Sequence, residues 1–178
     1  MHFKRFLDIK PEITNLFIIF INNKVLYDLN DKTFLLNSSF LNFTNFKFKK
    51  IGIAQDNNIN IYAADLSNES FNLSNQGYQS LVEYDLRYLM TILSEKDLGL
   101  LGRANQLLHY LNSTKHCGYC GSVMEFDSTE EAMFCKCNNL MIYPKISPCV
   151  LALIKKDNQI LLARNSLFPE GLYSALAG

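Results

Sequence analysis

Residues His116 to Pro148 read HCGYCGSVMEFDSTEEAMFCKCNNLMIYPKISP, and this stretch holds four of the five cysteines of the chain. In Cys117-Gly-Tyr-Cys120-Gly two residues separate the thiols, and the glycines let the turn fold back so that backbone amides face the sulfurs. Cys135 and Cys137 follow as a second pair. Two such pairs are what a small ribbon needs to surround one tetrahedral Zn²⁺. The sequence therefore predicts a zinc ribbon that binds its metal through all four cysteines.

The second pair is irregular, because Cys135-Lys-Cys137 has a single intervening residue where a zinc knuckle usually has two. This tightens the bite on the metal. Two disulfides, or unrelated buried thiols, are alternative interpretations. Disulfides would leave Cys149 unpaired, and the chain shows no charged-then-apolar leader of a secreted protein. The ribbon has few apolar residues, so a structural zinc would supply much of its stability, on the order of 10 kcal/mol or more.

Length and composition allow one sizeable core, or two small domains with a metal module between them, in 178 residues. The 48% of hydrophobic residues predict a folded chain. The chain has 17 Lys and Arg residues and 17 Asp and Glu residues, so its formal charges balance. This excludes the overall positive field of a protein whose main task is to bind the nucleic acid backbone. No apolar run reaches the length of a membrane span. With free thiols, this predicts a cytoplasmic protein without membrane association.

Two hairpins are predicted before the ribbon. The first covers residues 16–29 and turns at Asn22-Asn23-Lys24. The second joins residues 46–55 to residues 59–66 through Asp56-Asn57-Asn58. The N-terminal region is therefore expected to be mainly sheet, with four inward-facing residues in the second hairpin: Phe46, Phe48, Ile51 and Ile53.

A helix is predicted from about residue 95 to residue 112, because Ser94 is a typical N-cap and acidic residues follow it in the first turn. Residues 84–93 fit either a short helix or a buried strand. His109 is expected to be a partly buried packing residue, and His116 a flank of the metal site. The leucines expected on one face of the helix are Leu98, Leu101, Leu108 and Leu111.

The remaining segments carry weaker signals. Residues 31–45 show no clear periodicity and are assigned no element, and residues 67–80 are a polar connection. After the ribbon, residues 150–154 and 160–163 are expected to form a third hairpin around Lys155-Lys-Asp-Asn-Gln159, and residues 172–178 to begin a further strand.

Five segments in order, CGYCG, TEEAMFC, IYPKISPCVLALI, ILLAR and GLYSALAG, resemble the NADH pyrophosphatases of the Nudix superfamily. The resemblance covers about residues 84–178. It implies an α+β protein with a mainly-β N-terminal domain, a zinc ribbon and the first strands of a truncated Nudix α/β/α domain. The implied boundaries are 1–93 for the N-terminal domain, 94–113 for a connecting helix, 114–146 for the ribbon and 147–178 for the incomplete Nudix domain.

The resemblance also implies an activity. The family hydrolyses the diphosphate of NADH or NAD to nicotinamide mononucleotide and AMP, and bacterial members remove NAD caps from RNA. Glutamates of the Nudix box hold the catalytic Mg²⁺ or Mn²⁺. Gly178 matches the first glycine of that box, so we expect the catalytic glutamates after it and no turnover by the 178 residues alone. Family members are homodimers whose sites use both subunits.

Four substrate or metal contacts carry over from the family. Glu130 and Tyr143 match residues that contact the nucleotide, and Arg87 matches a substrate-binding arginine if a one-residue gap is allowed. The backbone carbonyl of Ala177 matches one that coordinates a catalytic cation. Without the resemblance, Glu130 would be read as a solvated charge and Tyr143 as an ordinary packed aromatic residue.

The second cysteine pair departs from the family pattern. Counting back from Pro144, the fourth cysteine of the family falls at Asn138, one position after Cys137. A one-residue shift must then be absorbed before Tyr143. Two alternative functions remain open: a zinc-ribbon binding module without enzymatic activity, and a degenerate gene product. The acidic character of the ribbon argues against a module that grips phosphates.

Overall fold

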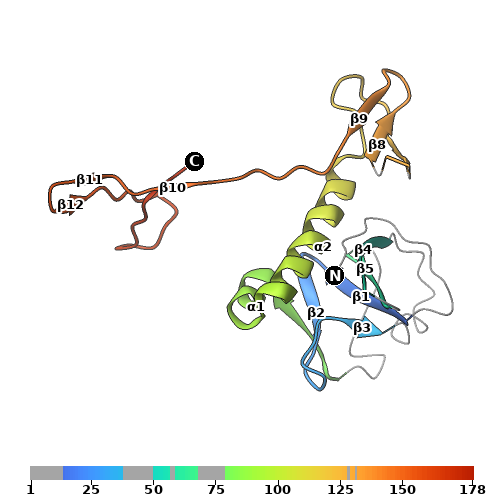
Figure 1. Ribbon diagram of the computed structural model, residues 1–178, viewed down its shortest axis with the longest axis horizontal. Helices are drawn as coiled ribbons and strands as arrows, with labels where there is room; N and C mark the ends of the chain where they lie inside the picture. Colours follow the sequence, from blue (N-terminus) through green and yellow to red (C-terminus); the bar gives the residue numbers. More distant parts are fainter. Residues whose placement is uncertain (1–13, 38–49, 57–58, 68–78, 128, 131) are drawn as a thin grey trace. The chain divides into compact units, whose positions relative to one another are not determined.

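The computed structural model describes residues 14–37, 50–56, 59–67, 79–127, 129–130 and 132–178 (Figure 1). The chain separates into two compact units, Met1–Pro144 and Lys145–Gly178. Among the described residues, no helix is long and apolar enough to cross a membrane.

A six-stranded sheet forms the centre of the first unit (Figure 1). Its strands follow the order β4-β5-β1-β2-β6, and β3 pairs with β1 beside this path. The strands are β1 (Thr14–Ile21), β2 (Lys24–Asp28), β3 (Leu36–Asn37), β4 (Lys50–Asp56), β5 (Ile59–Asp65) and β6 (Leu81–Asp85).

The first predicted hairpin is confirmed. β1 and β2 are antiparallel, with Phe20 opposite Val25. The turn consists of Asn22 and Asn23, whose φ angles are 49° and 65°. Two positive φ angles are typical of a type I′ turn, which matches the twist of the strands, and asparagine tolerates this conformation.

The second predicted hairpin is also confirmed, because β4 and β5 pair antiparallel. Its turn residues 57–58, Phe46 and Phe48, and the side chains of residues 51 and 53 lie outside what the structure describes. The sequence did not indicate the parallel pairing of β1 with β5, which runs from Thr14 opposite Ile59 to Phe20 opposite Asp65. Strands buried on both faces read as continuous apolar runs, and such a run does not specify its partner.

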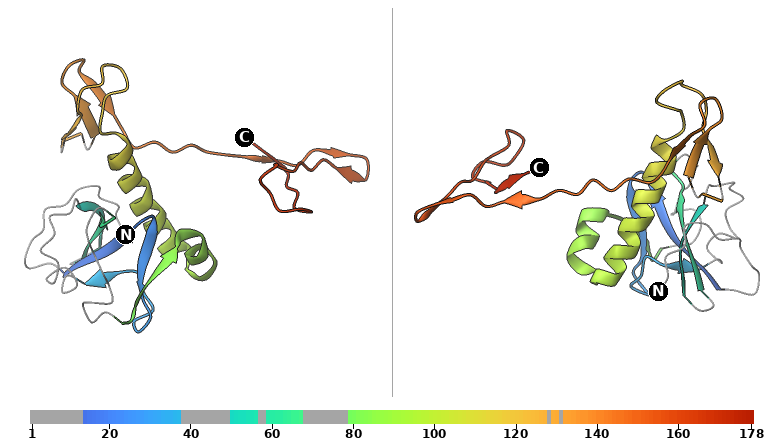
Figure 2. Two further views of the ribbon diagram at one scale, coloured as in Figure 1. Left: turned by 180° about the vertical axis from the view of Figure 1, so that it is seen from behind. Right: turned by 45° about the horizontal axis from the view of Figure 1, so that its top comes forward.

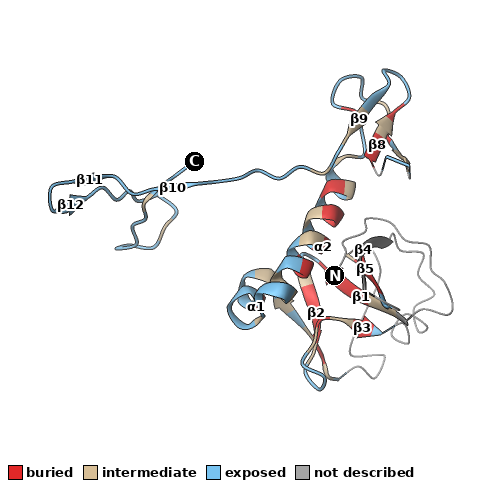
Figure 3. Cartoon of the chain, in the orientation of Figure 1, coloured by how far each residue is buried: buried red, intermediate tan, exposed pale blue. Residues whose placement is uncertain are grey.

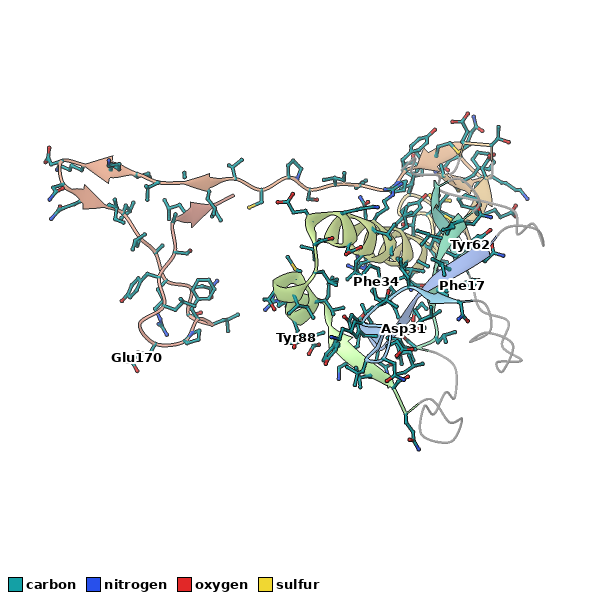
Figure 4. All side chains as sticks on the ribbon, turned by 60° about the horizontal axis from the view of Figure 1, so that its bottom comes forward. Phe17, Asp31, Phe34, Tyr62, Tyr88 and Glu170 are labelled. Carbon is teal, nitrogen blue, oxygen red and sulfur yellow. The ribbon has the colours of Figure 1, made fainter. Side chains whose placement is uncertain are left out.

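Two apolar clusters lie on opposite faces of the sheet, because successive residues of β1 alternate between them. Ile18 belongs to the cluster that includes the buried leucines of the helices. Phe17 belongs to the other, where its ring stacks on Tyr62 with centroids 5.5 Å apart (Figure 4). Figure 3 shows this burial concentrated on the central strands and the inner side of the long helix.

Two helices accompany the sheet. α1 (Leu86–Ile92) follows β6 directly, so the ambiguous segment is a strand end followed by a short helix. α2 (Glu95–Ser113) packs against β4 and β5 (Figure 2). Its predicted N-cap is confirmed, since the Ser94 hydroxyl accepts a hydrogen bond from the Asp97 N–H at 3.2 Å.

The helix face is as predicted, with Leu101 and Leu108 buried and Leu98 and Leu111 partly buried. The prediction for His109 is wrong, because the structure places it on the exposed side of α2. It directly follows the buried Leu108, and adjacent helical positions point about 100° apart.

The ribbon is a three-stranded antiparallel sheet of β7 (Glu125–Asp127), β8 (Ala132–Cys135) and β9 (Leu140–Ile142). Tyr110 of α2 joins this sheet to the helix. Its hydroxyl donates to the Ile142 carbonyl at 2.5 Å and accepts from the Met133 N–H at 2.6 Å. The end of α2 is therefore bonded to two strands of the ribbon.

The second unit contains four two-residue strands: β10 (Leu151–Ala152), β11 (Lys155–Lys156), β12 (Gln159–Ile160) and β13 (Leu176–Ala177). The third hairpin exists, but its predicted turn was too long. Lys155 and Lys156 already pair with Ile160 and Gln159, which leaves residues 157–158 as the turn, with Asp157 at φ 52°. The predicted final strand is β13, which pairs with β10. A Nudix fold for this unit stays a prediction.

Candidate metal centre

The first cysteine pair sits in a tight turn at the end of α2. The Cys117 N–H donates to the Ser122 carbonyl, and the Gly121 N–H donates to the Cys117 carbonyl, both at 2.8 Å. Gly121 has a φ of 73°, which a residue with a Cβ rarely adopts. The glycine thus lets the chain reverse directly after Cys120.

The second pair sits where β8 turns into β9. Cys135 is the last residue of β8 and lies opposite Leu140, the first residue of β9. The four residues between them form the turn, in which Asn139 has a φ of 53°. Cys137 is therefore a turn residue, whereas Cys135 is held by the sheet.

Three sulfurs gather at these turns. The Sγ atoms of Cys117, Cys120 and Cys135 all lie within 4.8 Å of one another, and those of Cys120 and Cys135 are 3.5 Å apart. Thiolates bound to one tetrahedral Zn²⁺ at 2.3 Å are separated by roughly 3.8 Å. Three soft thiolates at this spacing fit a zinc ion. This group can hold such a metal.

Cys137 lies outside this group. Its Sγ is 3.0 Å from the Ser122 Oγ, and the residue is exposed. Asn138 contacts one of the three sulfurs, because its amide nitrogen lies 3.6 Å from the Cys117 Sγ. The assignment of Cys137 as the fourth ligand stays a prediction.

Hydrogen bonds and burial shift the pKa values of the clustered thiols. The backbone N–H groups of Cys120 and Tyr119 lower the pKa of Cys117. The side chain and then the backbone of Ser122 lower the pKa of Cys120 to about 6, so it is mainly thiolate at neutral pH. Burial raises the pKa of Cys135. A bound cation would reverse this last effect, because coordination favours the thiolate.

A small apolar cluster lies beneath the sulfurs. It consists of Tyr110, Cys117, Met124, Met133 and Cys135, all buried. Tyr110 was not predicted from the sequence, although its place in the last turns of α2, just before the first cysteine pair, was a usable signal. A few apolar side chains and the Tyr110 hydroxyl thus hold the ribbon, and a bound metal would add to them.

Glu130 and Tyr143, far apart in the ribbon sequence, are brought together by the fold. The Tyr143 hydroxyl donates to the Glu130 Oε2 at 3.1 Å, and both residues are exposed. Glu130 follows the turn after β7, where the Asp127 Oδ1 accepts hydrogen bonds from the N–H groups of Thr129 and Glu130. Tyr143 directly follows β9. The two side chains therefore form one polar and aromatic surface on the ribbon.

The other two predicted residues lie elsewhere. Arg87 is exposed on α1. Ala177 lies in β13 of the second unit, opposite Leu151. Their roles in substrate or cation binding stay predictions.

The chain has curated relatives. The NAD-capped RNA hydrolase NudC of Escherichia coli O157:H7 is 38% identical over 98 residues, which are 53% of this chain and 38% of that protein. The protein of that name from Shigella boydii serotype 18 is 42% identical over 79 residues, 44% of this chain and 31% of that protein. The chain is a homologue of the NudC hydrolases.

The similarity to NudC has a limited extent. The chain matches about a third of the length of these relatives. No family model matches it. The NudC relatives are hydrolases by name, which agrees with the resemblance to NADH pyrophosphatases and does not favour a binding module without enzymatic activity.

Proposed function

We propose that this chain is part of a Nudix hydrolase that cleaves the diphosphate of NAD or NADH into nicotinamide mononucleotide and AMP, and that also removes NAD caps from RNA. The similarity to NudC supports the reaction class. The observation that supports the proposal for this chain is the hydrogen bond between Tyr143 and Glu130. The resemblance assigns both of these residues to nucleotide binding.

The chemistry of this pair suits one end of a dinucleotide. An exposed tyrosine ring offers a face on which a base can stack, and such stacking is worth about 1–3 kcal/mol. The carboxylate of Glu130 can accept hydrogen bonds from a ribose hydroxyl or an amino group. Their mutual hydrogen bond orients both groups before a ligand arrives.

The remaining assignments complete the proposal. Arg87 would pair with the diphosphate, since a guanidinium binds phosphate oxygens in a bidentate way. The carbonyl of Ala177 would be one ligand of a catalytic Mg²⁺ or Mn²⁺, which neutralises the phosphoryl oxygens and activates water. Carboxylates outside residues 1–178 would hold most of the cation. The zinc centre would be structural, and the protein would act as a cytoplasmic homodimer.

NADH binding tests the proposal without needing turnover. Titration calorimetry would compare the unaltered chain with Tyr143→Ala and Glu130→Gln, using Tyr119→Ala as the control. Tyr119 is a matched control because it is also a ribbon tyrosine and is 85% exposed. We expect Tyr143→Ala to weaken binding by about 5- to 100-fold, Glu130→Gln to weaken it less, and Tyr119→Ala to leave it unchanged. Equal affinities for all four proteins would refute the assigned nucleotide contacts.

A further inference from the structure

The two cysteine turns of the ribbon have the same local geometry. In each, a buried cysteine is followed four positions later by a residue with positive φ, Gly121 at 73° and Asn139 at 53°. The Sγ of Cys117 receives the backbone N–H groups two and three positions later in the chain. The same is true of Cys135. Both turns are therefore built as one kind of knuckle around their first sulfur.

This equivalence pairs the residues of the two turns. Cys120, three positions after Cys117, corresponds to Asn138, three positions after Cys135. Tyr119 corresponds to Cys137. The ring of Tyr119 is 85% exposed, which shows that this position of the knuckle points its side chain away from the sulfurs. Cys137 is likewise exposed.

Distances agree with this correspondence. The Asn138 Oδ1 lies 3.9 Å and its Nδ2 lies 3.6 Å from the Cys117 Sγ. A sulfur and an oxygen ligand of the same tetrahedral Zn²⁺ are roughly 3.6 Å apart, from bond lengths of 2.3 and about 2.1 Å. The amide oxygen thus lies within about 0.3 Å of ligand spacing from the Cys117 sulfur. The Cys137 Sγ instead lies 3.0 Å from the Ser122 Oγ.

We propose that the metal centre has three thiolates and one amide oxygen, supplied by Cys117, Cys120, Cys135 and Asn138, and that Cys137 is a free thiol beside it. Compared with a four-thiolate centre, this one carries one negative charge less. An amide oxygen is also a poorer ligand for a soft cation than a thiolate. Metal affinity is therefore lower than in a four-cysteine ribbon, and the free thiol remains open to alkylation.

Cobalt substitution distinguishes the ligand sets, because thiolate-to-Co²⁺ charge-transfer absorption grows with the number of bound thiolates. We expect Cys137→Ser to leave the absorption and the Kd for Co²⁺ unchanged. Asn138→Ala should weaken binding by about tenfold or more, and Asn138→Cys should increase both absorption and affinity. Weaker absorption in Cys137→Ser would overturn the proposal. An unchanged Kd and unchanged visible bands in Asn138→Ala would do the same.

Alkylation tests the same point on the unaltered chain, so it does not depend on whether a variant folds. The Zn²⁺-loaded protein would be treated with iodoacetamide and the labelled cysteines identified by mass spectrometry. Cys137 should react as fast as the exposed Cys149, while the three ligand cysteines react only after chelation. Protection of Cys137 to the same degree as Cys117 would refute the proposal. Neither experiment depends on binding or cleavage of a dinucleotide.

Discussion

Strand β1 and the segments 150–154 and 160–163 of the C-terminal unit have similar apolar sequences and opposite burial (Figure 3). Ile18 and Ile19 of β1 are fully buried, whereas Leu151 is 72% and Leu161 is 50% exposed. β1 pairs with β5 along one edge and with β2 and β3 along the other. The strands of Lys145–Gly178 are two residues long. An apolar run therefore predicts a strand, but its neighbours in the fold decide whether it is buried.

The largest expected effect concerns catalysis. The 178-residue chain should not hydrolyse NADH with Mg²⁺ or Mn²⁺, whereas a version extended through a Nudix helix should. In the C-terminal unit the resemblance assigns only the carbonyl of Ala177 to the cation, and one neutral oxygen does not hold Mg²⁺ in place. Release of AMP from NADH over time measures this for both proteins. Clear metal-dependent turnover by the 178 residues would show that the active site has been assigned to the wrong residues.

Amide hydrogen exchange would compare the two regions directly. Amides of β1, β2 and β5 should exchange about 10³-fold or more slowly than those of residues 150–178, because exchange in a buried sheet requires nearly global unfolding. The exposed leucines of the C-terminal unit also favour self-association, so the sample must be shown to be monomeric. Uniformly slow exchange across residues 150–178 in a monomer would contradict this prediction.

Removal of the metal should destabilise the ribbon, because the apolar cluster of the ribbon is small. Chelation should expose β7, β8 and β9 to proteases and leave the β1–β6 sheet protected, since a structural zinc contributes on the order of 10 kcal/mol to such a unit. Limited proteolysis with and without chelator measures this. Elemental analysis of protein purified without added metal should find one zinc per chain. If the protease cuts the ribbon equally with and without the chelator, and loss of the metal has been verified, the metal has no structural role.

Truncation of a single apolar residue should have different effects in the two regions. Ile18→Ala should reduce the free energy of unfolding by about 2–5 kcal/mol, because it leaves a cavity between the sheet and α2. Leu161→Ala, which removes a half-exposed side chain, should change it by less than about 0.5 kcal/mol. Urea unfolding followed by circular dichroism gives both values. Similar losses in the two variants would mean that the C-terminal unit is buried in solution.

A further prediction concerns a single hydroxyl group, that of Tyr110. Tyr110→Phe leaves the Met133 N–H and the Ile142 carbonyl without their partner, which should destabilise the ribbon by about 1–3 kcal/mol. Tyr88→Phe is the control, since Tyr88 is an exposed tyrosine on α1. The midpoint of ribbon unfolding, followed by Co²⁺ absorption, reports the difference. Equal midpoints would show that the Tyr110 hydroxyl does not tie the helix to the ribbon.

Features that depend on neighbouring residues can be predicted from the sequence alone. Asn22 and Asn23 predict a hairpin turn because they tolerate positive φ, and Ser94 predicts a helix start because its hydroxyl reaches the Asp97 N–H. The spacing of Cys117 and Cys120 likewise predicts a knuckle, because the turn involves only neighbouring residues. These signals depend on a few adjacent residues, so they can be interpreted without knowledge of the fold.

Contacts between residues far apart in the sequence are known only from the fold. It pairs β1 with β5 in parallel, and it places the Tyr143 hydroxyl on Glu130. It also places the Asn138 amide beside the Cys117 sulfur and the Cys137 sulfur beside the Ser122 hydroxyl. Contacts of this kind depend on strand register and on the direction of each side chain, which no local pattern specifies.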